Sequence, residues 1–180
     1  MTTFMMVLTL FAPATAQQAP PAACPMHTAH ATSARAAAPQ QSHAAHADMD
    51  ARGTVAMGFD QSRATHHFTV LATGGVIEIT ANAKEDEAVR SQIVAHLGDI
   101  SRRFKAGDFG IPEATHGVVP PGAAGMAASR DHIEYRFEPI PDGGRVHITT
   151  SDRAALAAVH AFLRYQIDEH RTGGSPAPRA

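Results

Sequence analysis

The sequence is poor in the residues that stabilise small exported domains or attach them to charged partners. Its 180 residues include one cysteine, two tyrosines and no tryptophan, and a lone cysteine cannot form an intrachain disulfide. Only 18% of the residues are charged, and the formal net charge is −2. That balance argues against binding to nucleic acid or to a membrane surface through bulk charge. No uninterrupted apolar run reaches the roughly 18 residues that suggest a transmembrane segment.

Histidine is the residue in excess. Twelve of the 180 residues are histidines, and imidazole titrates near neutral pH and is the commonest metal ligand in proteins. Hydrophobic residues make up 44% of the chain, which is normal for a domain with a packed core. The composition therefore favours metal handling by a folded protein.

Four segments differ in composition along the chain. Residues 1–16 combine a short apolar run with the small-residue pattern Ala14-Thr15-Ala16 and predict a secretory signal peptide. Residues 17–54, rich in Ala, Pro, Gln and His, predict a disordered tail. Residues 55–173 predict one folded domain, and residues 174–180 a disordered C-terminus. The signal peptide makes the expected location periplasmic or secreted.

The domain carries a strand-strand-helix pattern twice. Alternating residues at 66–73 and 76–80 flank Gly74-Gly75, and those at 132–138 and 145–150 flank a turn at 141–144. Amphipathic helices are predicted at residues 84–106 and after a cap at Ser151. Residues 108–126 hold many Pro and Gly and predict an irregular loop. The expected fold is α+β, with duplicated strand-strand-helix units forming a four-stranded antiparallel sheet and two helices on one face, in a strand order that stays open.

Several histidines fall on the faces predicted to be buried. A two-residue turn at Gly74-Gly75 places residue 70 opposite residue 79 and puts His66 on the apolar face of its hairpin. His96, His160 and His170 occupy inward positions of the two helices. An unpaired polar group in a core costs a few kcal/mol, and metal ligation or hydrogen bonding would offset that cost. The further candidate ligands in the domain are His116, Met126 and Met57.

The tail holds a second set of candidate ligands. Its metal-binding residue types are Cys24, Met26, His27, His30, His43 and His46. Thiolate and thioether together with imidazole suit Cu(I), whereas imidazole alone suits zinc, Cu(II) or nickel. The segment Cys24-Pro25-Met26-His27 resembles the Cys-Pro-Met-His segment of heavy-metal-binding modules, including those at the N-termini of copper-exporting P-type ATPases. A low-complexity spacer without ligand function is the alternative interpretation.

The domain also resembles a family of small, mostly uncharacterised bacterial proteins. The shared segments are Met57-Gly58-Phe59, Thr65-His66-His67-Phe68, His160-Ala161-Phe162-Leu163 and the stretch from Asp168 to Gly173. Some members of that family are labelled aspartate carbamoyltransferase. This chain does not support the label, because it is about half the length that such an enzyme needs and lacks a Ser-Thr-Arg-Thr phosphate-binding segment.

These observations predict an exported metal-binding protein, with copper as the favoured ion and zinc or haem as alternatives. In this hypothesis the tail captures ions and the domain holds one among histidine and methionine ligands. A small metal-dependent or haem-binding redox protein or enzyme would use the same residues. The remaining alternative is a structural module whose histidines are ordinary core residues. No sequence motif identifies a catalytic residue.

Overall fold

A computed structural model describes residues 38–179 of the chain and, from residue 47 onward, their side chains. The predicted signal peptide and four candidate ligands of the tail, Cys24, Met26, His27 and His30, lie outside the described residues. His43 and His46 lie in helix α1 (Ala38–Met57), in the part whose side chains are not described. Among the described helices, none combines the length and the hydropathy that crossing a bilayer requires.

The sheet confirms the predicted fold class and gives the strand order that the sequence left open. Its strands are β1 (Ala64–Leu71), β2 (Gly74–Ala81), β3 (Glu134–Ile140) and β4 (Gly143–Thr149). All neighbours are antiparallel, in the order β1-β2-β4-β3, so the second strand of each hairpin lies at the centre. On the buried face, Val70, Val146 and Ile148 are fully enclosed. The opposite face carries charged pairs such as Glu78 with Arg145.

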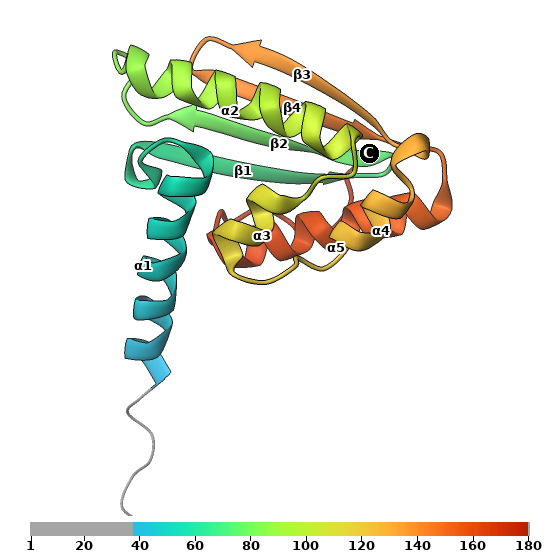
Figure 1. Cartoon of the computed structure of the whole chain (residues 1–180), viewed down its shortest axis with the longest axis horizontal. Coiled ribbons are helices and arrows are strands. Elements are labelled where there is room, and N and C mark those ends of the chain that lie inside the picture. The colour runs from blue at the N-terminus through green and yellow to red at the C-terminus, as the bar shows by residue number, and fades with distance from the viewer. Residues whose placement is uncertain (1–37, 180) are drawn as a thin grey trace, which may run out of the picture. The chain divides into compact units, whose positions relative to one another are not determined.

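A long helix follows each hairpin, as the apolar spacing predicts. The helices are α2 (Glu87–Lys105) and α5 (Arg153–His170). Each begins at an aspartate whose carboxylate accepts a backbone hydrogen bond, Asp86 from the N–H of Val89 and Asp152 from that of Ala155. The cap of α5 is therefore the residue after the predicted Ser151. Figure 1 shows both helices on the same side of the sheet.

Each helix covers mainly the hairpin of the other unit. Helix α5 packs on β1 and β2, and α2 packs chiefly on β4 and β3. Glycines allow this close approach at equivalent places in the two hairpins. A Cβ atom at Gly75 would lie 2.2 Å from Cδ1 of Leu163 in α5, and one at Gly144 would lie 3.1 Å from Cδ1 of Leu97 in α2. The two units are thus interlocked around a common core.

The register of the first hairpin differs from the prediction. Val70 pairs with Gly75, not with residue 79, and the turn is formed by residues 72 and 73. The glycine pair belongs to the strand, where helix α5 and strand β4 approach it closely, and Gly74 also adopts a φ of 147° that favours glycine. The shift is an even number of residues, so Phe68, Val70, Ile77 and Ile79 of the predicted set are still buried on one face, whereas Ala72, also predicted there, lies in the turn and is exposed.

The segment predicted as an irregular loop contains two short helices. They are α3 (Gly110–His116) and α4 (Ala123–Ala128). Gly117 ends α3 at φ 73°, and Gly122 begins α4 at φ 85°, in the left-handed region that glycine adopts without strain. The glycines thus mark helix ends and do not prevent helix formation. The short 3-10 helices η1 (Gln61–Arg63) and η2 (Arg130–His132) precede β1 and β3.

Two stretches that composition assigned to disordered termini have defined structure. Helix α1 occupies the second half of the predicted tail, in a segment rich in the strong helix former alanine. Its Arg52 Nε donates a hydrogen bond to the carbonyl of Thr115 in α3, at 3.1 Å. Near the other terminus, the N–H of Arg179 donates to the carbonyl of Val70, so this residue pairs with the outer edge of β1. Tertiary contacts explain order that composition alone did not predict.

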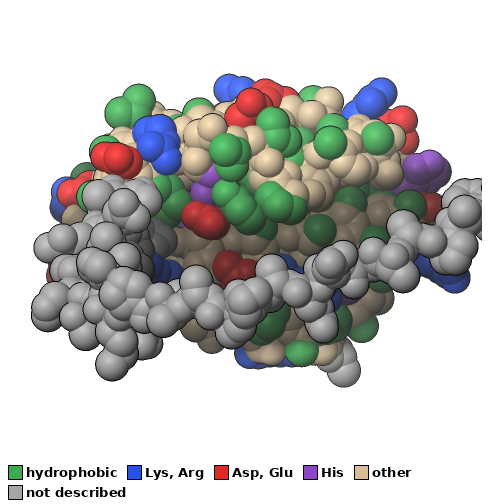
Figure 2. Space-filling model, turned by 90° about the horizontal axis from the view of Figure 1, so that it is seen from below, with side chains coloured by type: hydrophobic (Ala, Val, Ile, Leu, Met, Phe, Trp, Pro, Cys, Tyr) green, Lys and Arg blue, Asp and Glu red, His purple; other side chains and the backbone are tan. Residues whose placement is uncertain are grey.

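Some hydrophobic surface remains exposed. Figure 2 shows hydrophobic side chains gathered on the face seen from below, with charged side chains around them. Among the described residues, the large exposed hydrophobic side chains are Val55 in α1 and Val118 and Val119 after α3. Val55 is 84% exposed, so it serves as a reference for a hydrophobic residue outside the core.

We predict that Leu163→Ala destabilises the domain by about 2–5 kcal/mol, because it removes a fully buried side chain at the crossing of α5 and β2. Val55→Ala, which removes an exposed side chain, should change the free energy of unfolding by less than about 0.5 kcal/mol. Denaturant unfolding of both variants measures the difference. Equal effects would contradict the assigned core.

Candidate functional site

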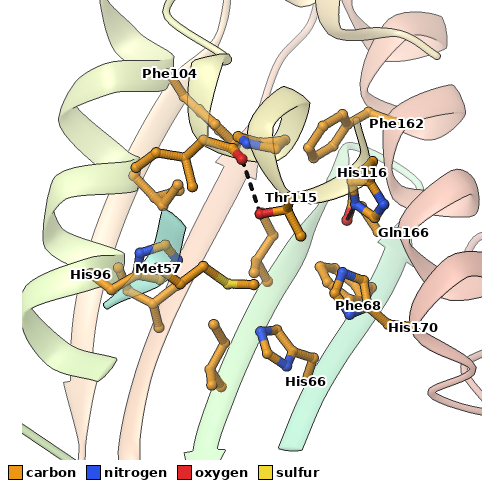
Figure 3. A pocket seen from close by; sticks show the side chains of 16 residues that line it. Met57, His66, Phe68, His96, Phe104, Thr115, His116, Phe162, Gln166 and His170 are labelled. Atoms are coloured by element: carbon orange, nitrogen blue, oxygen red, sulfur yellow. Dashed lines mark hydrogen bonds between the residues drawn. The ribbon is translucent and has the colours of Figure 1, made fainter. Parts of the chain in front are cut away.

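A small pocket with a cavity volume of about 50 Å³ lies between the sheet and helices α2, α3 and α5. Most of its lining is apolar, and its polar side chains are four histidines, one threonine and one glutamine: His66, His96, His116, His170, Thr115 and Gln166. None of the lining residues is Asp, Glu, Lys or Arg. Figure 3 shows His96 and Met57 on one side of the pocket, and His116, Gln166 and His170 on the other.

His66 and His170 form a stacked pair in this pocket. His66 is only 8% exposed and points from β1 to the buried face, where its ring centroid lies 4.9 Å from that of His170 at the end of α5. Burial, together with the neighbouring histidines, holds the pKa of His66 well below its usual value. The imidazole is therefore neutral at pH 7. No described residue supplies a hydrogen-bond partner for its Nε2 atom.

His116 is oriented by Gln166. The His116 Nε2 atom and the Gln166 Oε1 atom lie 3.0 Å apart, and because the amide oxygen can only accept, Nε2 carries the proton. In a neutral imidazole the other nitrogen, Nδ1, then has a free lone pair, and it is buried without a described partner. Burial lowers the pKa of His116 and favours this neutral form. Its ring centroid lies 5.3 Å from that of His170.

His96 and Met57 form the opposite side. His96 is 8% exposed and contacts the ring of Phe59 edge to face, at 5.6 Å between centroids. Burial lowers the pKa of His96 to about 4, so this imidazole is also neutral at pH 7. Met57, the last residue of α1, places a thioether on the same pocket, and its sulfur lies 3.7 Å from the Gln61 amide nitrogen. The pocket thus combines neutral imidazoles with one thioether.

The structure brings five of the seven candidate ligands of the domain to this pocket and leaves two elsewhere. His66, His96, His116, His170 and Met57 line it. His160 lies outside the pocket, and its Nε2 donates a hydrogen bond of 2.8 Å to the backbone carbonyl of Leu71. Met126 is fully buried within the hydrophobic core and does not line the pocket.

Sequence reasoning missed Gln166 and Phe59. Gln166 is 4% exposed and orients His116, although the two residues are 50 positions apart. A usable signal was present, since Gln166 lies three residues after Leu163 and one before Ile167 on the buried face of α5. Phe59 follows α1 and contacts both His66 and His96. Its position depends on tertiary packing, which no local pattern predicts.

The other half of the duplicated fold fills the equivalent place with aromatic residues. His66 lies five residues before the end of β1, and Tyr135 lies five residues before the end of β3. His170 follows the capping Asp152 at the same spacing as Phe104 follows Asp86. Phe104 and Tyr135 contact each other at 5.9 Å between ring centroids. A histidine pair on one side of the fold therefore corresponds to a Tyr/Phe pair on the other.

A polar groove leads from solvent to the histidine pair. Its cavity volume is about 300 Å³, and it shares His66 and His170 with the inner pocket. Asp50 of α1 and Thr172 after α5 also line the groove. The two imidazoles thus separate a polar groove from an apolar interior, where a solute entering from the groove would meet them.

The arrangement can supply neutral donors to an ion or small solute, but no preformed three-ligand cage is present. Among the described residues, no three His, Cys, Asp or Glu side chains are grouped so that they could hold one metal ion. The ring planes of His66 and His170 lie only 19° from parallel. Coordination of one ion by both would require rotation of at least one ring.

Comparisons with known proteins assign neither a family nor a function to the chain. No protein-family model matches the sequence, and neither the curated proteins nor the solved structures give a match. The resemblance to the small bacterial family therefore stays a prediction.

We predict that the domain loses stability as the pH falls from about 6.5 to about 4, because the unfolded chain binds protons that buried His96 does not. His96 alone should account for about 2 kcal/mol between pH 7.5 and pH 5. His96→Phe should reduce the pH dependence of the free energy of unfolding by that amount. Met57→Leu alters the same pocket without a titratable group and should leave the slope unchanged. An unchanged slope in His96→Phe would contradict the assigned burial.

Proposed function

We propose that the protein binds a transition-metal ion, with copper favoured, in the histidine pocket. The observation that carries this proposal is the pair of buried imidazole nitrogens without described hydrogen-bond partners, His66 Nε2 and His116 Nδ1, in one pocket with the Met57 thioether. Neutral imidazole and thioether are the donors that copper prefers. The export of the protein and a capture role for its tail remain part of the same hypothesis.

The hydrogen bond between His116 and Gln166 supports this interpretation. A metal-binding histidine commonly donates its second N–H to a carbonyl or carboxylate oxygen, which fixes the tautomer and aims the free nitrogen at the ion. Gln166 Oε1 holds His116 in that way. A buried imidazole nitrogen without a hydrogen-bond partner costs about 1–3 kcal/mol, which a bound ion or an ordered water would offset.

The duplication gives a second line of support. Tyr135 and Phe104 show that an aromatic pair can fill the equivalent place in this fold. Packing alone therefore does not require His66 and His170. Their imidazoles instead supply nitrogen donors beside the polar groove, where an ion could enter.

The same correspondence provides the test. His66→Tyr combined with His170→Phe transfers the aromatic pair to the pocket, and we expect this variant to bind about one metal equivalent fewer than the wild-type full chain. A ligand at a hundredfold excess over its Kd stabilises a folded protein by about 2.7 kcal/mol, or roughly 10 °C in the unfolding midpoint. Copper should raise the midpoint of the wild type by about that amount and that of the variant much less. Elemental analysis and thermal unfolding of untagged protein measure both effects.

The control replaces two exposed histidines by the same residue types, as His67→Tyr with His132→Phe. This protein has the same histidine count as the test variant and the same tail, so any difference between the two comes from the pocket. Equal copper stoichiometry and equal midpoint shifts in both variants would contradict the proposal and favour the structural role. A visible haem absorption band in the purified wild type, lost in the pocket variant, would instead favour haem binding.

A further inference from the structure

We infer that the pocket selects a soft monovalent ion, Cu(I), over Cu(II) and zinc. The inference rests on the proposed metal-binding function and assigns the oxidation state of the ion. Three features of the pocket lead to it: its lack of charged side chains, the softness and small number of its donors, and its apolar walls.

The lack of charged side chains in the pocket is the feature that most strongly favours a monovalent ion. No Asp or Glu lines the pocket, so no carboxylate there can compensate the charge of a bound cation. The cost of moving an ion from water into a medium of low dielectric constant grows with the square of its charge, so a divalent ion pays about four times as much as a monovalent one. Neutral His66 and His116 therefore suit a monovalent ion.

The donors point to the same ion. Thioether sulfur is a soft ligand that favours Cu(I), while imidazole accepts several metals. Zinc in proteins almost always takes four ligands, and Cu(II) favours square or tetragonal sites with nitrogen and oxygen donors. The described residues provide no group of three His, Cys, Asp or Glu for such a site. An ion that tolerates low coordination numbers needs only two or three donors, and the lining offers two imidazole nitrogens and the Met57 sulfur. Because Met57 and His116 lie on opposite sides of the pocket, binding one ion with both requires their side chains to move.

The walls of the pocket also disfavour the divalent ions. A divalent ion held by few protein ligands completes its coordination with water, whereas the walls here include Leu97, Ile100 and Phe104, all at most 4% exposed. These apolar side chains offer no hydrogen bonds to the water ligands of such an ion. The same surroundings favour an ion that can remain without water ligands.

The experiment compares the wild-type full chain with the His66→Tyr/His170→Phe variant for four ions. The probes are Cu(I) under reducing, anaerobic conditions, Ag(I) as a monovalent ion that does not change oxidation state, Cu(II) and Zn(II), each in competition with a chromogenic chelator. We expect the variant to lose about one equivalent of Cu(I) and of Ag(I), and to bind Cu(II) and Zn(II) as the wild type does. Subtracting the two titrations removes any contribution of the tail, which both proteins carry.

A second variant isolates the thioether and guards against a folding defect. Met57→Leu conserves the volume of the side chain, which proteins usually tolerate well, and should weaken pocket binding of Cu(I) and Ag(I) at least tenfold. Cooperative denaturant unfolding of each variant checks its fold. Imidazole-dependent binding that Met57→Leu does not weaken would overturn the role of the sulfur in the selectivity.

The outcomes separate this inference from the proposed function. Loss of Zn(II) or Cu(II) binding equal to the loss of Cu(I) binding in the His66→Tyr/His170→Phe variant would overturn the selectivity but keep the pocket as a metal site. If no ion distinguishes this variant from the wild type, both the inference and the proposed function are wrong. Loss confined to Cu(I) and Ag(I) supports both.

Discussion

The packing of each helix across the hairpin of the other unit is the constraint on which the structure depends. Gly75 beneath Leu163 and Gly144 beneath Leu97 bring helix and sheet close enough to share one core. Because each helix needs the opposite hairpin, neither strand-strand-helix unit can bury its apolar face alone. The interlocking also places the end of α5 beside β1, where it brings His170 against His66.

The two halves of the fold differ most at this contact. On one side Tyr135 and Phe104 close the core, and on the other His66 and His170 stand between a polar groove and an apolar pocket. Helix α3, which lies between α2 and β3 and outside both strand-strand-helix units, adds His116 and Thr115, and α1 adds Met57. The candidate site is thus built where elements outside the repeat meet one half of it.

Much of the fold follows from the sequence, because apolar periodicity and capping residues are local. The spacing of Val89, Ile93 and Leu97 predicts the buried face of α2, and the alternation in each hairpin predicts which side of the sheet is buried. The exact register does not follow, since glycine serves both turns and close packing. Strand order, the helices α3 and α4, and the contacts of α1 depend on tertiary interactions that no short pattern encodes.

The candidate site was only partly predictable for the same reason. Helical periodicity places His96 and His170 inward, and they do reach one pocket. The same rule places His160 inward. It does not distinguish a position at the pocket from one beside the backbone carbonyl of Leu71, which accepts a hydrogen bond from His160. The direction in which a helical side chain points follows from the local sequence spacing. The residues that it contacts depend on how the two units interlock.

The buried imidazoles affect both the stability of the core and its capacity to bind a metal ion. Each half buries a polar atom without a described partner, the Tyr135 hydroxyl in one and His66 Nε2 in the other, but of the two groups only the neutral imidazole is a common metal ligand. Lowered pKa values show that burial keeps His66, His96 and His116 uncharged at pH 7, and an uncharged imidazole is the form that binds metals. The surroundings that bury these side chains are therefore also those that prepare them as ligands, because burial keeps each imidazole in the neutral form that binds metals.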